Sequence, residues 1–392
     1  MLFQALDNKN DCFSVYSEGA VTKNPIMSTL THTWTPTLHY HNKRVEYAQI
    51  WCHGESLENA CPDELKKQWQ QLSTKPRAYI NSLSKAMVDL SQVCIYDLLP
   101  EHFLLDFYEV KNQICEHVFS TGARPKNYEF MHDLLIMLKQ IEQKELNIKM
   151  SNLEYSSSKV RQCISKIDDT QKNIVYSPWV TATGRLSTGQ NSFPILTLNK
   201  ELRTALEPNN DLYVELDYNS AELRVLLGLL GQPQPEEDIH SWISENIFDN
   251  KYTREETKKK VFAWLYNPKA KNKKLNHFLD RERVHDIFYK DGHVHTPFDR
   301  ELTCPSEKAV NYLVQSTASD LFLTSAIKIN KMLQNKKSYV AFCIHDSLVI
   351  DFAKEDRELI RELVEEFSST MYGTFKTNLS IGENFGVLKK VA

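Results

Sequence analysis

The stretch Leu216-Asp217-Tyr218-Asn219-Ser220-Ala221-Glu222-Leu223-Arg224 decides how the fold of this chain is interpreted. Residues 212–217 alternate like a strand, and a helix is expected from Ser220. The carboxyl group of Asp217 would therefore stand at the end of a strand, just before a helix. A single aspartate at a strand end is usually a helix cap or a turn residue, so a chemical role requires a second feature.

The second feature is the stretch Ile344-His345-Asp346-Ser347. Residues 338–351 read as two strands that meet there, so Asp346 is predicted at a hairpin turn, where side chains project clear of a sheet. Two carboxylates can bridge two Mg²⁺ ions, which lie about 3.5–4 Å apart in such sites. We therefore predict that Asp217 and Asp346 hold two Mg²⁺ ions, with Mn²⁺ as an alternative metal and the carbonyl of Tyr218 as a further ligand.

A basic helix is predicted between these two stretches. Four residues spaced four apart would form one slanted stripe on it: Arg254, Lys258, Phe262 and Tyr266. Thr253 and Glu256 have the spacing of a capping box, which predicts that the helix begins there. The cations could hold a triphosphate, with the rings against the base or sugar. An amphipathic helix with two aromatic residues in the core is the alternative. With the two aspartates, the stripe favours template-directed polymerisation of nucleotides over a binding module.

The composition of the 392 residues is ordinary for a globular protein, with 41% hydrophobic and 25% charged residues. No apolar run is long enough to cross a membrane, and the N-terminus lacks the features of a secretory signal. We therefore expect a cytoplasmic protein with no membrane partner. The eight cysteines are scattered without a Cys-x-x-Cys, which argues against a disulfide framework or a zinc ribbon. The net charge of -4 does not indicate a nucleic-acid binder, but lysines gather between residues 252 and 275, and a groove needs only local basic charge.

The segments outside these motifs predict a mixed architecture. Short strands are expected at residues 12–16, 30–35 and 47–52, and helices at residues 99–119 and 128–148. The turn between the two helices carries Arg124 and Lys126, which could contact the backbone of a duplex; a plain helical hairpin is the alternative. From residue 177 onward strands and helices alternate, and residues 355–372 read as an amphipathic helix.

These stretches resemble the motifs of the family A DNA polymerases, which include bacterial DNA polymerase I and compact phage replicases. Residues 217–224 resemble motif A, residues 254–266 resemble motif B on the fingers helix, and residues 345–347 resemble motif C, His-Asp-Glu. Smaller matches follow in the order of the family: Thr181–Ser187 with its Arg185, Gln190 and Asn191, Asp238–His240, Asn311 with Gln315, and Gly382–Phe385. The resemblance extends from around residue 100 to the C-terminus.

The resemblance implies an α/β (α+β) right-hand polymerase fold with a palm sheet, helical fingers and a helical thumb. Its parts would be a small β-rich N-terminal domain at 1–75, the thumb at 76–150, palm at 151–228 with motif A, shortened fingers at 229–292 with motif B, and palm at 293–392 with motif C. The N-terminal domain would be either a remnant of an exonuclease domain or a new small domain.

The resemblance implies a DNA-directed DNA polymerase that extends a primer 3′ end with dNTPs by two-metal nucleotidyl transfer. Asp217, Asp346 and Lys258 would be catalytic, and Glu222 would be a steric gate that excludes a ribose 2′-hydroxyl and bonds Tyr266. The residues expected to bind the dNTP are Arg254, Lys258, Phe262, Tyr266, Glu222 and His240. The residues expected to contact primer-template DNA are Arg185, Gln190, Asn191, Asn311, Gln315 and His345, together with Arg124 and Lys126 of the helical turn.

The sequence departs from the pattern of the family at several positions. Ser347 replaces the glutamate of motif C, and Ala263 and Asn267 stand where motif B usually has glycine. No Asp-x-Glu strand of a proofreading exonuclease is found, so we expect an enzyme without proofreading. Its candidate protein partners are a separate exonuclease, a helicase-primase and a single-strand-binding protein.

Two other functions stay open at this point. His-Asp-Ser is also the form of motif C in single-subunit RNA polymerases, which suggests an RNA-synthesising or primase-like relative; the carboxylate gate Glu222 argues against it. A catalytically inactive accessory protein that only binds primer-template DNA is the other alternative, and the presence of both aspartates and Lys258 argues against that.

Overall fold

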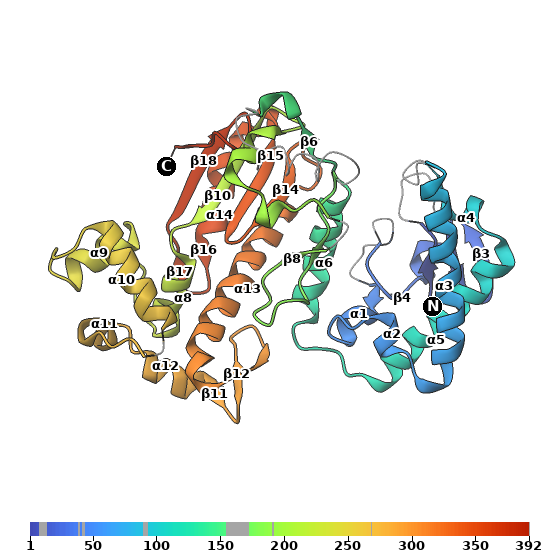
Figure 1. The fold of residues 1–392 in the computed structure, drawn as a ribbon, viewed down its shortest axis with the longest axis horizontal. Helices are drawn as coiled ribbons and strands as arrows, with labels where there is room; N and C mark the ends of the chain where they lie inside the picture. Colours follow the sequence, from blue (N-terminus) through green and yellow to red (C-terminus); the bar gives the residue numbers. More distant parts are fainter. Residues whose placement is uncertain are drawn as a thin grey trace. The chain divides into compact units, whose positions relative to one another are not determined.

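The computed structural model describes residues 1–7, 14–37, 40, 44–88, 93–153, 172–189, 192–267 and 269–391. The chain divides into two compact units, Met1–Gln140 and Ile141–Ala392. Figure 1 shows a helical first unit with short strands and a second unit built around a sheet. Within the described residues, no helix combines the length and apolar character that a membrane crossing requires.

The first unit combines a small sheet with two long helices. Its antiparallel sheet consists of β1 (Gln4–Ala5), β2 (Ser14–Ser17) and β3 (Ala20–Lys23), and its long helices are α3 (Asp63–Lys85) and α5 (Glu101–Thr121). Shorter elements are η1 (Met27–Thr29), β4 (His32–Thr33), β5 (Glu46–Tyr47), α1 (Ala48–Trp51), α2 (Leu57–Ala60) and α4 (Ile95–Leu98), and α6 (Tyr128–Glu142) crosses into the second unit. Trp34, Trp69, Phe103 and Ile114 are among the residues of its core.

Several predicted elements of this region differ from the structure. The predicted strand at 47–52 is wrong, because only Glu46–Tyr47 form a strand and Ala48–Trp51 form helix α1, whose Ala48 and Ile50 are buried. A short apolar run has no period that separates a strand from a buried helical turn, so packing decided. The helix predicted at 128–148 ends at Glu142, and Asn147–Ile148 form β6 instead. The border predicted at residue 75 falls inside α3, and the division into a β-rich domain and a thumb stays a prediction.

The cysteines of the described chain are mostly reduced. Free thiols are found at Cys52, Cys61, Cys115, Cys304 and Cys343. Cys94 is disulfide-bonded, so the cysteines of the described residues are not all free.

The second unit is built on a five-stranded antiparallel sheet. Its strands, in spatial order, are β14 (Tyr339–Ile344), β15 (Ser347–Phe352), β10 (Leu212–Tyr218), β18 (Thr377–Gly382) and β19 (Lys389–Lys390). The strand predicted at 212–217 and the hairpin predicted at 338–351 are confirmed. Along β10, Val214, Leu216 and Tyr218 are buried, while Glu215 and Asp217 are partly exposed, so the two faces of this strand have different surroundings.

Two helices cover the buried face of this sheet. They are α13 (Ala309–Met332) and α14 (Ile360–Ser368) (Figure 1). The ring of Tyr218 stacks on Phe367 of α14 at 4.4 Å between centroids, and its hydroxyl donates to Ser325 Oγ of α13 at 2.8 Å. The amphipathic helix predicted at 355–372 is shorter than expected, because residues 354–359 form a 3₁₀ turn and Ser369–Thr370 form a strand.

Four short helices follow the motif A stretch and gather at one side of the second unit (Figure 1). After α8 (Ala221–Leu229) come α9 (Ile239–Asn246), α10 (Arg254–Tyr266), α11 (Lys273–Phe278) and α12 (Arg281–Phe288). The capping box of Thr253 and Glu256 is confirmed.

Small sheets and turns complete the unit: η3 (Met150–Asn152), β7 (Tyr176–Ser177) with β8 (Ser187–Thr188), η4 (Ile195–Thr197), η5 (Lys200–Ala205), β9 (Leu206–Glu207) with β6, β11 (Tyr289–Lys290) with β12 (His293–His295) and β13 (Glu301–Thr303), η6 (Ser306–Lys308), η7 (Lys354–Leu359), and β16 (Ser369–Thr370) with β17 (Gly373–Thr374).

Candidate active site

The two predicted metal aspartates lie at the same end of the central sheet. Asp217 of β10 pairs with Ser347 of β15, and Asp346 is the residue just before Ser347, in the turn that joins β14 to β15. The turn places His345 at a φ of 53°, a left-handed conformation that is uncommon for residues other than glycine. The antiparallel register and this two-residue turn together bring Asp346 beside Asp217.

The electrostatics of this edge favour a bound cation. Burial, followed by the charge of Asp346, raises the pKa of Asp217 to about 7, although the amide of Asn378 donates to Asp217 Oδ2 at 3.1 Å and opposes the shift. Burial also raises the pKa of Asp346. Each carboxylate is destabilised by burial and the pair by mutual repulsion, and a divalent ion with a preference for hard oxygen ligands relieves both. Asp217 and Asp346 therefore fit a divalent metal.

Asp217 and Asp346 are the two predicted metal ligands at this edge. In the described ranges of the chain, no group of three or more histidine, cysteine, aspartate or glutamate side chains has the arrangement of a metal site. A divalent ion held by Asp217 and Asp346 would therefore need further oxygen ligands from the backbone or from water.

Glu222, at the start of α8, receives hydrogen bonds from two distant parts of the sequence. Arg185, in the loop between β7 and β8, and Tyr266, at the end of α10, both donate to its carboxylate. Asn311 Nδ2 of α13 in turn donates to the carbonyl oxygen of Tyr266 at 3.2 Å. Burial and the charge of Asp346 raise the pKa of Glu222, while the charge and hydrogen bond of Arg185 oppose this. Two predicted site residues therefore contact the carboxylate of Glu222, and a third, Asn311, contacts one of them.

The loop that carries Arg185 is fixed to α13 by contacts that the sequence did not suggest. Gly184 has a φ of +73°, and its carbonyl oxygen accepts from Ser319 Oγ at 3.2 Å. A Cβ at Gly184 would come within 2.8 Å of the guanidinium of Arg300. Arg300 itself forms a bidentate pair with the fully buried Asp320, at 2.6 and 2.9 Å. Arg300 has no signal of its own in the sequence, because its role depends on this packing.

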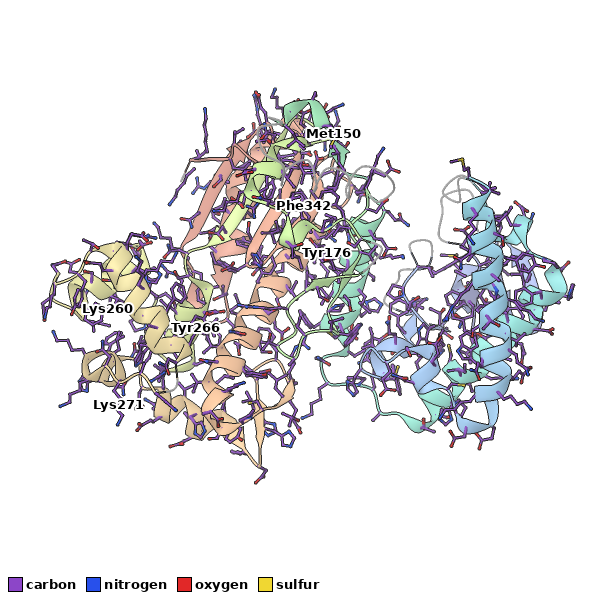
Figure 2. All side chains as sticks on the ribbon, viewed as in Figure 1. Met150, Tyr176, Lys260, Tyr266, Lys271 and Phe342 are labelled. Atoms are coloured by element: carbon purple, nitrogen blue, oxygen red, sulfur yellow. The ribbon has the colours of Figure 1, made fainter. Side chains whose placement is uncertain are left out.

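The stripe of α10 faces away from the core of the helix bundle. The buried residues of α10 are Thr257, Val261, Trp264 and Leu265, which form a different face. Lys258 Nζ lies 5.8 Å from the ring centroid of Phe262, and the rings of Phe262 and Tyr266 stack at 5.7 Å. Figure 2 shows Lys260 and Tyr266 along this helix. The alternative in which the two aromatic residues lie in the core is therefore wrong.

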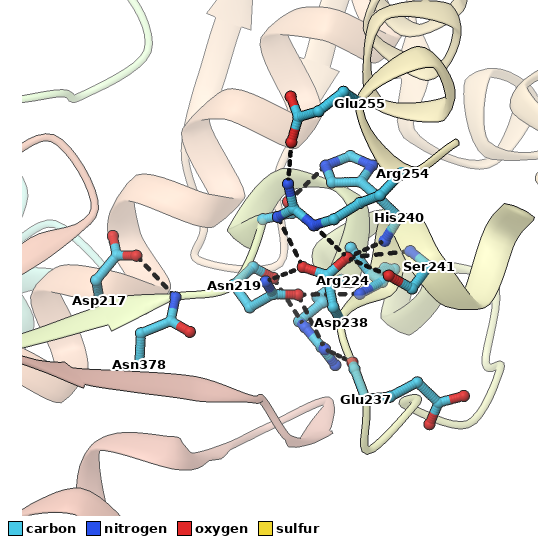
Figure 3. Close-up of polar contacts among 12 residues, drawn as sticks. Asp217, Asn219, Arg224, Glu237, Asp238, His240, Ser241, Arg254, Glu255 and Asn378 are labelled. Atoms are coloured by element: carbon cyan, nitrogen blue, oxygen red, sulfur yellow. Dashed lines mark hydrogen bonds and ion pairs between the residues drawn. The ribbon is translucent and has the colours of Figure 1, made fainter. Parts of the chain in front are cut away.

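Arg254 is held at the N-terminus of α10 by an aspartate that the sequence analysis had not singled out for this contact. Its guanidinium donates to both oxygens of Asp238, at 3.0 and 2.8 Å, and also to Glu255 (Figure 3). Asp238 caps α9 and accepts from Asn219 Nδ2 at 2.8 Å. Burial alone would raise the pKa of Asp238, but the hydrogen bonds from Arg254, Asn219 and Ser241 outweigh it and hold the pKa well below its usual range.

Arg224 and His240 are buried next to the residues that contact Arg254 and Asp238. The fully buried guanidinium of Arg224 donates to the carbonyl oxygens of Asn219, Pro235 and Glu237, at 2.9, 2.8 and 2.9 Å. Figure 3 shows Arg224 beside Asn219 and Glu237. His240 Nε2 lies 2.9 Å from Ser220 Oγ, and burial lowers the pKa of His240 to about 4. The imidazole is 0% exposed, so it is neutral at pH 7 and packs 5.7 Å from the ring of Phe262.

The remaining predicted residues lie in different places. Gln315 follows Asn311 by one turn of α13, and His345 is exposed in the hairpin turn. Gln190 and Asn191 lie outside the described residues. Arg124 and Lys126 belong to the first unit, where Arg124 pairs with Glu129 at 2.7 Å and lies over the ring of Tyr128. Both contacts of Arg124 lie within its own unit, and its contact with DNA stays a prediction.

Comparison with known proteins points to one group of enzymes. No family model matches the chain. The thermostable DNA polymerase I of Thermus aquaticus is 25% identical over 264 residues, which cover 54% of this chain and 32% of that protein. DNA polymerase I of Mycobacterium leprae is 23% identical over 275 residues, covering 56% of this chain and 30% of that protein. The chain thus spans about a third of the length of the curated relatives that it matches.

A solved structure has the same fold. The POL domain of Pol1 from M. smegmatis, in complex with DNA primer-template and dNTP, matches with a TM-score of 0.51 at 12% sequence identity. The match covers 74% of this chain and 76% of that chain. The predicted mixed helix and strand fold is therefore confirmed. The chain is similar over part of its length to DNA polymerase I proteins and has the fold of the Pol1 polymerase domain.

Proposed function

We propose that this chain is a DNA-directed DNA polymerase that extends a primer 3′ end with dNTPs by two-metal nucleotidyl transfer. The observation that carries the proposal is the juxtaposition of Asp217 and Asp346 at one edge of the sheet, next to the carboxylate of Glu222. The relationship to DNA polymerase I proteins supports the same reaction class.

Asp217 and Asp346 would hold two Mg²⁺ ions, or Mn²⁺ in their place, with the Tyr218 carbonyl as a further ligand. When bound, these ions would lower the pKa of the attacking 3′-hydroxyl and neutralise charge on the leaving pyrophosphate. The aspartates themselves position the ions and orient the reacting groups. Burial raises the pKa of both aspartates, and the charge of Asp346 adds to the shift of Asp217; a bound cation would offset these effects.

The stripe of α10 would bind the triphosphate. Lys258 carries a flexible ammonium next to the partly exposed ring of Phe262, where it could contact phosphate oxygens and donate a proton to the leaving pyrophosphate. Arg254 would exchange part of its contact with Asp238 for a phosphate oxygen. His240 is buried behind Phe262, so its contribution would be to support this ring unless α9 moves.

Glu222 would select the sugar. Its carboxylate is held by Arg185 and Tyr266, so it has little freedom to move aside for a ribose 2′-hydroxyl. Primer-template DNA would be contacted by Arg185, Asn311, Gln315 and His345, by Gln190 and Asn191, and by Arg124 and Lys126 of the first unit. We propose that the chain lacks proofreading activity. A separate exonuclease, a helicase-primase or a single-strand-binding protein would assist it.

Primer extension on a primed template tests this function. The chain with Mg²⁺ is expected to extend the primer with dNTPs, to prefer dNTPs over NTPs, and to leave a mismatched end undegraded. Asp217→Ala and Asp346→Ala are each expected to lower extension by more than about 100-fold. This exceeds the loss that typically follows when a residue that only hydrogen-bonds to a metal ligand is removed. Both variants should retain duplex binding. Substantial extension by either variant would refute the metal assignment.

The test also separates the two alternatives. Preferential use of NTPs would favour the RNA-synthesising relative that Ser347 suggests. If the purified chain extended no primer, and Asp346→Ala left DNA affinity unchanged, an inactive accessory protein that binds primer-template DNA would be the better description.

A further inference from the structure

Glu215 lies on the same face of β10 as Asp217, two residues earlier in the strand. Side chains two apart on a strand point to the same face. Val214 and Leu216, on the other face, are 1% and 0% exposed, whereas Glu215 and Asp217 are both partly exposed. A third carboxylate therefore accompanies the two aspartates.

Ser347 links this carboxylate to the metal-binding edge. Ser347 pairs with Asp217 across the strands, and its hydroxyl donates to Glu215 Oε1 at 2.8 Å. Ser347 is 5% exposed, so the hydrogen bond is largely shielded from water. The serine stands where the resembled His-Asp-Glu motif has an acid, and here it orients an acid from the neighbouring strand.

Glu215 lies where its charge can act on the metal-binding edge, and it has no cation directly beside it in the described part of its row of the sheet. The nearest cation in its row of the sheet is Lys390, which is separated from it by Ser380 of β18. The hydrogen bond found for the Glu215 carboxylate in the described chain comes from Ser347.

We propose that Glu215 is a positioning residue of the metal-binding edge, which adds a third negative charge beside Asp217 and Asp346 and holds the water ligands of the metal ions. Ser347 fixes its carboxylate in this role. Its carboxylate accepts a hydrogen bond from Ser347, so Glu215 would act from outside the direct ligands. Partners in such positions typically change metal affinity by about 10–100-fold. This inference rests on the proposed function of the two aspartates as metal ligands.

Titration of the full chain with Mn²⁺, followed by electron paramagnetic resonance, tests the proposal without requiring activity. Glu215→Gln removes the charge and retains an oxygen that can accept from Ser347. We expect it to weaken Mn²⁺ binding by about 10-fold and to raise the Mg²⁺ concentration for half-maximal primer extension by a similar factor. Glu362→Gln, on the exposed face of α14, is the matched control and should change neither value.

Two further variants separate charge from packing. Ser347→Ala removes the hydrogen bond and keeps the charge, and is expected to weaken Mn²⁺ binding less than Glu215→Gln does. Glu215→Gln combined with Ser347→Glu returns an acid to the edge and should recover part of the affinity. Circular dichroism checks that each variant is folded; if Glu215→Gln did not fold, Ser347→Ala would have to show the weakened binding for the proposal to stand.

The outcomes distinguish this inference from the proposed function. If Glu215→Gln bound Mn²⁺ as the unmodified chain does, Glu215 would have no positioning role, even if the chain extended primers. If the variant lost Mn²⁺ affinity while the unmodified chain extended no primer, the role of Glu215 would stand and the polymerase function would fail.

Discussion

At the scale of single residues, the position of Glu222 depends on hydrogen bonds from distant parts of the chain. Its carboxylate accepts hydrogen bonds from Arg185 and Tyr266, which lie 37 and 44 positions away in the sequence. Burial and Asp346 raise its pKa, and Arg185 acts in the opposite direction. The carboxylate is thereby fixed in position, which is what a steric gate against a 2′-hydroxyl requires.

Replacing Glu222 by alanine is expected to relax sugar selection. Because the shortened side chain leaves space for a 2′-hydroxyl, the ratio of kcat/KM for dNTP over NTP should fall at least about 10-fold, which corresponds to about 1.4 kcal/mol. Single-nucleotide primer extension measures this ratio. Glu245→Ala, an exposed change on α9, is the control. An unchanged ratio and rate would show that the gate lies elsewhere.

His240 should make the folded state sensitive to acid. Its pKa is lowered by burial from 6.5 to about 4, although Asp238 opposes the shift, so the unfolded chain binds a proton more readily than the folded chain between these values. The free energy of unfolding is therefore expected to fall as the pH drops from 6.5 towards 4. His240→Gln should reduce this slope in urea unfolding measured at several pH values. His277→Gln, at an exposed position, should leave the slope unchanged.

At the scale of elements, short connections position the site as much as the strands and helices do. The hairpin turn at residues 345–346 projects Asp346, and the loop between β7 and β8 projects Arg185. Helix α10 begins at a capping box and buries one face, which leaves its other face with Lys258 and Phe262 available for a ligand. The loop that carries Arg185 depends on a contact with the distant helix α13, whereas neighbouring residues form the hairpin turn and the cap of α10.

Gly184→Ala is expected to disturb the loop that carries Arg185. A residue other than glycine is disfavoured at the φ of +73°, by about 1–2 kcal/mol, and the added Cβ would come within 2.8 Å of Arg300. Thermal unfolding should show a lower stability, and primer-template affinity should fall with it. Gly189→Ala is a matched control in the same region, because a Cβ there meets no atom within 4 Å. Equal stability of the two variants would contradict this role of Gly184.

At the scale of the whole molecule, the chain consists of two units with separate cores. The core of the first includes Ile114, and that of the second includes Phe342, which packs on Tyr213 at 5.7 Å between ring centroids. The candidate catalytic residues all belong to the second unit, whereas Arg124 and Lys126 belong to the first. Damage to one core should therefore be felt mainly within its own unit.

Hydrogen exchange measured by mass spectrometry tests this division. Ile114→Ala, at a residue that is 0% exposed, should cost about 2–5 kcal/mol and increase exchange mainly in residues 1–140. Phe342→Ala, also at 0% exposure, should increase exchange mainly in residues 141–392. If either variant increased exchange equally throughout the chain, the two units would unfold as one cooperative body.

The sequence alone determined the features that depend on local order. Alternation predicted β10, the spacing of Thr253 and Glu256 predicted the start of α10, and the two strands around residue 345 predicted the hairpin. These features follow from the geometry of strands, caps and turns, which a few neighbouring residues decide. The motif order also predicted the family A fold, although it could not predict where helices would stop in the first unit.

Only the tertiary structure decided which groups meet. The pairing of Arg254 with Asp238, the contact of Arg300 with Gly184 and the hydrogen bond from Ser347 to Glu215 join segments 16, 116 and 132 positions apart. No local pattern encodes such contacts, because they depend on strand register and on how helices pack against the sheet. The same packing buries His240 and shifts the pKa of Asp217 to about 7, since both effects arise from surroundings that many distant residues build together.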